Sequence, residues 1–407
     1  MMTATQKIPS GYKQTEIGVI PADWDVKKLG DIADINMGQS PDSKNYNLTG
    51  HGMPLIQGNA DIKNRKSIER VWTTQITKIC EVGDLIMTVR APVGFIGVAS
   101  ENSCIGRGVC SFKAKGVEKN FLYHSLIFSE NSWKVLEQGS TFTAANSNQI
   151  IGFELLVPST TVEQSAISTV LSDSDSLIKK LERLIEKKRN IKQGAMQELL
   201  TGKRRLPGFS GKWEMKTLGE VVEFEHGRDL PKSDMSDEGI YKCIHYGQLF
   251  REYQELVGDI KSRTNSNAGR FYSKANDVLM PTSDVTPRGL ATASCIKEDG
   301  VILGGGILVI RFNTGYDGLY FSYFISQNKS MILKFVKGST VFHLYASDLA
   351  NLEVNFPGPD EQIAIANVLS DMDTEIEKLE SQLTKYQNIK QGMMQTLLTG
   401  KIRLLTK

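Results

Sequence analysis

Two long stretches of the chain repeat apolar residues at alternating spacings of three and four. One lies between Pro158 and Gly202 and the other between Pro357 and Gly400. This spacing predicts two helices, each with one apolar seam of the coiled-coil type, and a glycine at each end suits a helix C-cap. The predicted seam positions are Ile167, Leu171, Ser174, Ile178, Leu181, Ile185, Lys188, Ile191 and Ala195, then Ile365, Leu369, Met372, Ile376, Leu379, Leu383, Tyr386, Ile389 and Met393.

The start of each predicted helix carries capping residues. Thr160 and Thr161 stand before Glu163, which is the arrangement of a capping box. Pro359 precedes Glu361 at the corresponding place, and proline favours the first turn of a helix. The chain therefore predicts helix starts near both positions.

Helices of about 38 residues would span roughly 57 Å at about 1.5 Å per residue, and globular helices average about a dozen residues. We expect the two helices to pair antiparallel, because the first delivers the chain into the second globular part through residues 205–213. The predicted shape is two heads held apart by a two-helix spacer with a pseudo-two-fold axis. Two separate docking helices, or a coiled coil between two chains, remain open.

The whole chain is an internal duplication with a period of about 200 residues, too long for a solenoid repeat. Residues 190–206 and 388–404 agree at 14 of 17 positions, whereas residues 39–138 and 228–337 show little identity. Further matches in the same order join residues 24–38 to 213–227, 83–87 to 276–280, 139–141 to 338–340, 163–164 to 361–362, and 170–173 to 368–371.

The divergent parts alternate short apolar runs with turn residues. PLIQ, DLIMTV, DVLM and VILGGGILVIRF read as strands, and residues 121–136 and 319–335 have helical spacing. We predict an α/β (mixed) fold in which each globular domain has a mixed or antiparallel sheet and one or two helices. The expected segments are a first globular domain at 1–158, a first helical region at 159–204, a second globular domain at 205–356 and a second helical region at 357–407.

The composition indicates the class of protein and the compartment in which it is expected to act. The 407 residues are 40% hydrophobic, and no apolar run is long enough to span a membrane. The N-terminus lacks the apolar core of a signal peptide, and the cysteines form no CxxC pair, so we expect reduced thiols in a cytoplasmic protein. The net charge of +2 gives no general indication of nucleic-acid binding, which must rest on local features.

No catalytic signature emerges from the residues. Motifs for adenine methylation, for a phosphate-binding loop, for HExxH metalloproteases and for GxSxG hydrolases are missing from the sequence. Residues 304–306 are three glycines, which we interpret as a bulge in a strand because no helix start follows. The histidines are scattered and predict no metal site; they are His51, His124, His226, His245 and His343.

Two separated and unlike heads suit a duplex DNA target whose two half-sites differ. Base edges in the major groove are read by polar and basic side chains on loops and strand ends. The candidate DNA contacts are Gln57, Asn59, Arg90, Arg107, His245, Tyr246, Gln248, Ser283 and Arg288. The alternative is that these are turn residues selected for backbone geometry.

The repeated helix ends suggest repeated partners, because two equal surfaces can each bind one copy of the same subunit. Residues 178–205 hold ten Lys or Arg and three acids, and residues 376–403 hold five and two. Such charge indicates a solvated face, or else phosphate or partner contact. The candidate partner-binding residues are Asn190, Lys192, Gln193, Asn388, Lys390 and Gln391.

The chain resembles a known family, the specificity subunits of type I restriction-modification enzymes. The resemblance covers nearly the whole chain. Its carriers are YKQTEIGVIPADWDVKKLGDI at residues 12–32, the paired EQ dipeptides, VLSDSDSLI and VLSDMDTEI, and the repeated NIKQG and LLTGK.

The resemblance implies that the divergent parts are target-recognition domains and that the chain supplies sequence choice without catalysis. It implies double-stranded DNA and two modification subunits as partners, with restriction subunits joining the complex. The modification subunits would methylate adenine with S-adenosylmethionine, so this chain needs no cofactor of its own. Two other classes stay open: a stand-alone sequence-specific DNA-binding regulator, and a structural protein whose heads bind other proteins.

Overall fold

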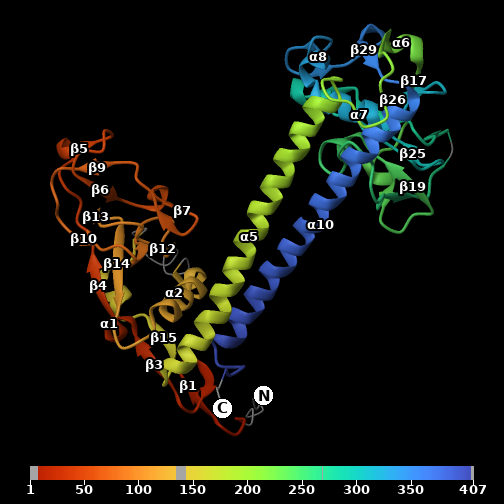
Figure 1. The fold of residues 1–407 in the computed structure, drawn as a ribbon. Helices are drawn as coiled ribbons and strands as arrows, with labels where there is room; N and C mark the ends of the chain where they lie inside the picture. Colours follow the sequence, from red (N-terminus) through yellow and green to blue (C-terminus); the bar gives the residue numbers. More distant parts are fainter. Residues whose placement is uncertain (1–7, 134–143, 268, 405–407) are drawn as a thin grey trace. The chain divides into compact units, whose positions relative to one another are not determined.

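The computed structural model describes residues 8–133, 144–267 and 269–404 (Figure 1). The chain forms two compact units. Unit 1 comprises Met1–Glu182 with Gln382–Lys407, and unit 2 comprises Arg183–Ser381. Each unit therefore holds one globular part, the start of one long helix and the end of the other. The compact units do not coincide with the two sequence repeats.

Unit 1 is built on two main sheets. The first is mostly antiparallel, with the order β4 (Ala33–Met37), β14 (Val109–Ala114), β11 (Leu85–Thr88), β12 (Ile96–Val98), β8 (Lys66–Ser67) and β7 (Ile62–Lys63). The second has the order β10 (Ile79–Cys80), β13 (Ser103–Ile105), β6 (Met53–Ile56), β9 (Trp72–Thr73) and β5 (Tyr46–Asn47). Smaller elements are β1 (Tyr12–Thr15) with β2 (Gly18–Pro21), β3 (Trp24–Lys28) with β15 (Glu154–Pro158), and the helices α1 (Leu29–Ile32), α2 (Lys119–Phe128) and α4 (Ser147–Ile151).

Unit 2 repeats this plan. Its antiparallel sheet has the order β17 (Val222–His226), β26 (Ile307–Phe312), β22 (Val278–Pro281) and β24 (Ser294–Cys295). Its second sheet has the order β21 (Phe271–Tyr272), β25 (Ile302–Leu303), β19 (Tyr241–Ile244), β20 (Arg263–Thr264) and β18 (Met235–Ser236). Smaller elements are β16 (Glu214–Thr217) with β29 (Glu353–Phe356), β23 (Ser283–Asp284) with β28 (Phe342–His343) and β27 (Lys337–Gly338), and the helices α6 (Leu218–Val221), α7 (Gly318–Gln327), α8 (Lys329–Leu333) and α9 (Ala346–Leu349).

The two units share strand order despite their divergent sequences. In both second sheets one inner pair is parallel, β13 with β6 and β25 with β19. The predicted α/β class and duplication are confirmed. The helix predicted at 121–136 begins close to the expected place, but α2 already ends at Phe128. The last three predicted residues and residues 139–141 lie outside the described ones. The helix predicted at 319–335 is two helices, because the chain breaks helical geometry at Asn328.

The prediction of one bulged strand at VILGGGILVIRF is wrong. Its first half is β25 and its second half is β26, and these strands belong to different sheets. The three glycines are the crossing between the sheets. The same crossing in unit 1 is made by residues 106–108, between β13 and β14.

The long helices are α5 (Thr161–Leu199) and α10 (Pro359–Leu397), each of 39 residues and each continuous (Figure 1). Both start where the sequence predicts, and Gly202 and Gly400 have positive φ of 69° and 68° just past the ends. The first capping box is only half present. The Thr160 hydroxyl accepts the Glu163 amide at 3.3 Å, but the Glu163 carboxylate makes other contacts.

The predicted seam is confirmed over the first half of each helix. Ile167 and Leu171 share a core with Met394, Leu397 and Leu398 in unit 1. The equivalent core of unit 2 joins the start of α10 to the end of α5 by the residues Ile365, Leu369, Met196, Leu199 and Leu200. In each unit the start of one helix thus lies beside the end of the other, which is the predicted antiparallel pairing.

The seam prediction is wrong at Ile191, Tyr386 and Ile389, whereas Ala195 and Met393 pack against the cores as predicted. Ile191 and Ile389 are 46% and 42% exposed, and Tyr386 is also exposed. The strict heptad instead continues through Lys192 and Lys390, which lie in the seam with 13% and 14% of their side chains exposed. A charge can occupy these positions because each one has a partner on the opposite helix.

The two seam lysines make equivalent ion pairs. Lys192 Nζ lies 2.5 Å from Asp373 Oδ1 in unit 2, and Lys390 Nζ lies 2.6 Å from Asp175 Oδ1 in unit 1. Tyr323 of α7 also donates its hydroxyl to Asp373 at 2.6 Å. Each pair therefore joins both long helices, and in unit 2 the globular helix as well.

Each helix start is also held by an arginine from the segment that follows the end of the other helix. In unit 1 the buried Glu163 carboxylate accepts from Trp24 Nε1 at 3.2 Å and from Arg403 Nε at 2.6 Å. In unit 2 Glu361 accepts from Trp213 Nε1 at 3.2 Å and pairs with Arg205. The end of each repeat thus neutralises a buried charge at the helix start of the other repeat.

Replacing Arg403 with Met should leave Glu163 buried without a cation. Breaking a buried pair in this way costs about 3–5 kcal/mol. We expect a loss of that order in the opening free energy of amides in β3 and the first turn of α5, measured by native-state hydrogen exchange. Adding Glu163→Gln should recover part of the loss.

The matched control for this variant is Arg204→Met. Arg204 pairs with Glu198 at the surface, where both side chains are more than half exposed. Such a pair contributes less than about 1 kcal/mol. If Arg403→Met cost no more stability than this control, the buried Arg403–Glu163 ion pair would not stabilise unit 1 as described.

We expect buried His124 of α2 to make the stability of unit 1 depend on pH. It is fully buried, and its Nε2 lies 3.0 Å from the Ser172 hydroxyl of α5. Burial lowers its pKa from 6.5 to about 4, against the opposing influence of Asp175. The unfolded chain therefore binds more protons between these values, so the stability contributed by neutral His124 is present above pH 6.5 and is lost as the pH falls toward 4.

Between pH 7 and pH 5 this loss should amount to about 2 kcal/mol. The measurement is the opening free energy of α2 amides at the two pH values, in the unmodified chain and in His124→Gln. The glutamine variant should lose less stability over this interval by about the same amount. Identical pH profiles for the two proteins would rule out His124 as the titrating group.

Candidate nucleic-acid interface

The two sheets of unit 1 meet at a point where four chain segments touch. We call it the first junction and define it by residues 38–39, Gln57, 89–90 and 106–108. Backbone bonds fix it: the Gly38 amide donates to Val109 O at 3.0 Å and the Gln39 amide to Ile105 O at 2.9 Å. Further bonds run from Gly106 N to Ile56 O at 2.8 Å and from Val89 N to Gly108 O at 2.9 Å.

Glycine is required at this junction because backbones approach closely. A β-carbon on Gly38 would lie 2.2 Å from Gly106 O, and one on Gly108 would lie 2.0 Å from Gln57 O. Neither contact is sterically possible without moving the backbone. The junction is therefore rigid, and its outward side chains are those of the residues between and beside the glycines.

Unit 2 has a second junction with the same connections. The Gly227 amide donates to Ile307 O at 2.9 Å, and the Arg228 amide donates to Leu303 O at 3.0 Å. Two more bonds correspond, Gly304 N to Ile244 O at 2.8 Å and Thr282 N to Gly306 O at 2.9 Å. We define the second junction by residues 227–228, His245, 282–283 and 304–306.

The equivalent bonds align the two junctions residue by residue. Gln39 corresponds to Arg228, Gln57 to His245, Arg90 to Ser283, and Arg107 to Gly305. Equivalent backbone hydrogen bonds thus present a different set of side chains in each unit, although Gly306 has a positive φ and its counterpart Gly108 does not.

The structure brings together three predicted contacts of the first globular part. Gln57, Arg90 and Arg107 all lie at the first junction and are exposed. Asn59 lies two residues on, in the 3₁₀ turn Asn59–Asp61, and is also exposed. The sequence interpretation missed Gln39 and Arg228, because only the cross-sheet bonds show that the chain after β4 and β17 reaches the junctions.

The predictions for unit 2 divide into two groups. His245, Tyr246 and Ser283 lie at or next to the second junction, and His245 and Tyr246 line a hollow of about 770 Å³. Arg288 is exposed in the 3₁₀ turn Pro287–Ala291.

Gln248 lines the same hollow, but most of its side chain is buried. It is 7% exposed, its Oε1 accepts the His245 amide at 2.8 Å, and its Nε2 donates to Glu252 and Ser262. These bonds occupy the amide with the local turn.

Charge distinguishes the junction arginines from the others of unit 1. Arg65, Arg70 and Arg403 are paired with carboxylates. Arg90 and Arg107 make no side-chain hydrogen bond or ion pair with the described residues, so within that part of the chain the donors of both exposed guanidinium groups are unpaired. In unit 2, burial and Lys232 lower the pKa of His245, which favours the neutral imidazole.

The predicted partner residues separate into two kinds. Asn190, Asn388 and Gln391 are exposed on the long helices, and Gln193, also exposed, donates to Gln327 at 2.9 Å. Lys192 and Lys390 are instead engaged in the helix seam, which the repeated sequence alone could not reveal. The exposed apolar residues Ile191 and Ile389 stand beside them at equivalent places.

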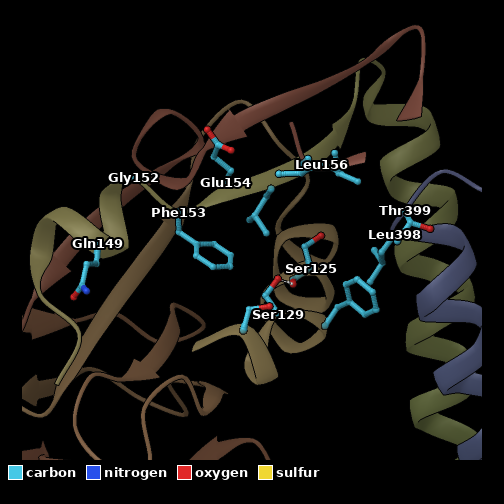
Figure 2. Close-up of a pocket in the computed structure, with 13 residues that line it drawn as sticks. Ser125, Ser129, Gln149, Gly152, Phe153, Glu154, Leu156, Leu398 and Thr399 are labelled. Atoms are coloured by element: carbon cyan, nitrogen blue, oxygen red, sulfur yellow. Dashed lines mark hydrogen bonds between the residues drawn. The ribbon is translucent and has the colours of Figure 1, made fainter. Parts of the chain in front are cut away.

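A second hollow, of about 670 Å³, lies in unit 1 between α2, β15 and the end of α10. Figure 2 shows Phe153 and Leu156 across from Ser125 and Ser129, with Leu398 to one side. Its lining is mainly apolar, and its charged residue is the acid Glu154. It therefore does not suit a polyanion such as DNA.

The described residues contain no group of three His, Cys, Asp or Glu side chains placed to hold a metal ion. Among the helices described, none is both long and apolar enough to cross a membrane.

Comparison with known proteins identifies the family. The family model for the type I restriction modification DNA specificity domain matches twice, at residues 21–189 and 210–386. A putative type I restriction enzyme MjaX specificity subunit of Methanocaldococcus jannaschii is 34% identical over 48% of this chain, and the match spans 47% of that relative's length. The MjaIX specificity subunit of the same organism is 24% identical over 97% of this chain and 96% of its own.

The fold agrees with a solved relative. The crystal structure of the S subunit of a type I restriction-modification system from M. genitalium has a TM-score of 0.63, with 15% identity, over 98% of this chain and 99% of that chain. The two family matches together cover most of the chain and fall on its two repeats. The chain therefore belongs to the family of type I restriction-modification DNA specificity subunits.

Proposed function

We propose that this chain selects the DNA target of a type I restriction-modification complex by reading two unlike half-sites, one with each junction. The observation that carries the proposal is the pair of junctions with equivalent backbone bonds and different exposed side chains. A rigid backbone that presents unpaired guanidinium and amide groups suits base edges, which offer matching acceptors and donors. Unlike side chains at equivalent positions favour unlike sequences.

The chain itself performs no chemistry in this proposal. Adenine methylation, with S-adenosylmethionine as cofactor, would belong to two modification subunits, and restriction subunits would join through the complex. The absence of catalytic motifs from the sequence supports this division. The cytoplasmic location expected from the cysteines stays a prediction.

The modification subunits would dock on the equivalent ends of α5 and α10. Each end exposes an asparagine, an isoleucine and a glutamine in the same order, at residues 190–193 and 388–391. An exposed isoleucine among polar groups is suited to the apolar centre of a protein contact. Two copies of one surface favour two copies of one partner.

A stand-alone DNA-binding regulator remains the second candidate. It would use the same junctions without any subunit on the helix ends. The family assignment favours the complex over the regulator, and the two differ in whether a methyltransferase subunit co-purifies.

The reading of DNA is tested by exchanging one recognition part. Residues 39–138 of the full chain are replaced by the equivalent residues of another specificity subunit. Methylated sites are then mapped in a host that expresses the complete system. The half-site read by the first junction should change while the other half-site stays. A change in both half-sites, or in neither, would contradict separate reading.

Docking is tested with Ile191→Asp and Ile389→Asp. Burying a carboxylate at the centre of a contact is strongly unfavourable, so each variant should weaken one partner site by at least about tenfold. Native mass spectrometry of the co-expressed complex should give one methyltransferase subunit for each single variant and none for the double variant. DNA binding by the chain should remain.

The matched control is Ile76→Asp, since Ile76 is 52% exposed in unit 1 away from the helix ends. It should keep both partner subunits. A double variant that also kept both would exclude these helix ends as the docking surface.

A further inference from the structure

The second junction lacks an arginine at the position that Arg107 occupies in the first. Arg107 lies between two glycines, and its amide donates to the Ser40 hydroxyl at 3.0 Å. Gly106 and Gly108 on either side are each fixed by a cross-segment backbone bond. The Arg107 backbone is therefore held in place while its exposed side chain has no partner among the described residues.

Gly305 occupies the corresponding place in unit 2, and the backbone does not require glycine there. A β-carbon on Gly305 would meet its nearest heavy atom, Asp229 N, at 3.9 Å, which is ordinary contact. Its φ is not in the left-handed region, whereas Gly306 has a φ of +83°. A β-carbon at residue 305 is therefore sterically allowed, so the fold does not require glycine there.

Unit 2 instead carries an arginine on the other side of its junction. Arg228 corresponds to Gln39 of unit 1, and its amide makes the same bond as that of Gln39. Arg228 is exposed and has no ion pair among the described residues. Among the described residues, each junction thus has an arginine without an ion pair on a backbone fixed by hydrogen bonds, and Arg107 and Arg228 occupy positions that do not correspond.

We propose that Arg107 and Arg228 are guanine-reading side chains, one for each half-site, and that they act from different positions of the same junction. This inference rests on the proposed function. A guanidinium can donate two parallel hydrogen bonds to O6 and N7 of guanine, and a good pair of this kind discriminates by about 5- to 150-fold against the wrong base. Because the two positions differ, the guanines occupy different places within the two half-sites.

The test is a reciprocal exchange at equivalent positions, Arg107→Gly and Gly305→Arg, in the full chain. Each variant is incubated with a pool of random-sequence DNA duplexes, and the bound sequences are read. Arg107→Gly should relax one guanine position of the first half-site by about 5- to 150-fold and leave the second half-site unchanged. Gly305→Arg should add a guanine preference in the second half-site, and Arg228→Gln should remove one there.

Arg183→Gln is the matched control, since Arg183 is exposed on α5 away from both junctions. It should not alter the selected sequences. Circular dichroism should match for all variants, and because Gly305→Arg gains a preference, a folding defect cannot imitate its effect.

Two outcomes overturn the inference. If Arg107→Gly weakened binding evenly over all sequences, Arg107 would contact phosphate rather than a base. If Gly305→Arg added no preference, the junctions would not present equivalent reading positions. The proposed function would fail separately, by the unmodified chain selecting no sequence from the pool.

Discussion

A charged residue in an apolar seam allows few arrangements of the helices that enclose it. Lys192 and Lys390 lie in the seam of α5 and α10, and each is neutralised by an aspartate of the other helix. A slip of one helix turn, or a parallel pairing, would bury a lysine without a carboxylate and cost several kcal/mol. The two ion pairs thus select the antiparallel register from the many that apolar residues alone would permit. Polar residues in coiled-coil seams select registers in the same way.

That register explains why the compact units differ from the sequence repeats. Once the helices run antiparallel, the end of each repeat lies at the helix start of the other. Arg205 and Arg403 can then neutralise Glu361 and Glu163, which are buried beside Trp213 and Trp24. Each globular part is completed by residues of the other repeat. The repeated segments NIKQG and LLTGK therefore make equivalent helix contacts, one set in each unit. These contacts do not require the two recognition parts to have similar sequences.

Much of this architecture could be predicted from the sequence, since helix periodicity, capping residues and the duplication all appear within one chain. What could not be predicted depends on contacts between distant segments. Lys192 and Lys390 were predicted to be partner residues because they recur at both helix ends, and only the opposite helix shows their ion pairs. Gln248 looked like a loop donor, but its amide caps its own turn.

The junctions could be predicted only in part from the sequence, because they too depend on contacts between distant segments. Gln57, Arg90 and Arg107 stand out as polar residues beside strands, whereas Gln39 and Arg228 reach the junctions only through bonds across the sheets. The three glycines at 304–306 suggested a bulge, because a bulge and a crossing between sheets require the same local flexibility. Strand partners decide between these two structures, and a single sequence does not give them.

The junctions also separate what folds the protein from what it reads. Backbone hydrogen bonds and glycines without room for a β-carbon hold each junction together, and neither depends on the exposed side chains. Substitutions at exposed positions usually change stability by no more than about 0.5 kcal/mol. The residues at positions 39, 57, 90 and 107 could therefore diverge from their counterparts in unit 2 without loss of the fold. If the junctions read DNA as proposed, a change of target needs only a few side chains on an unchanged backbone, and an asymmetric target would follow from two copies that diverged separately.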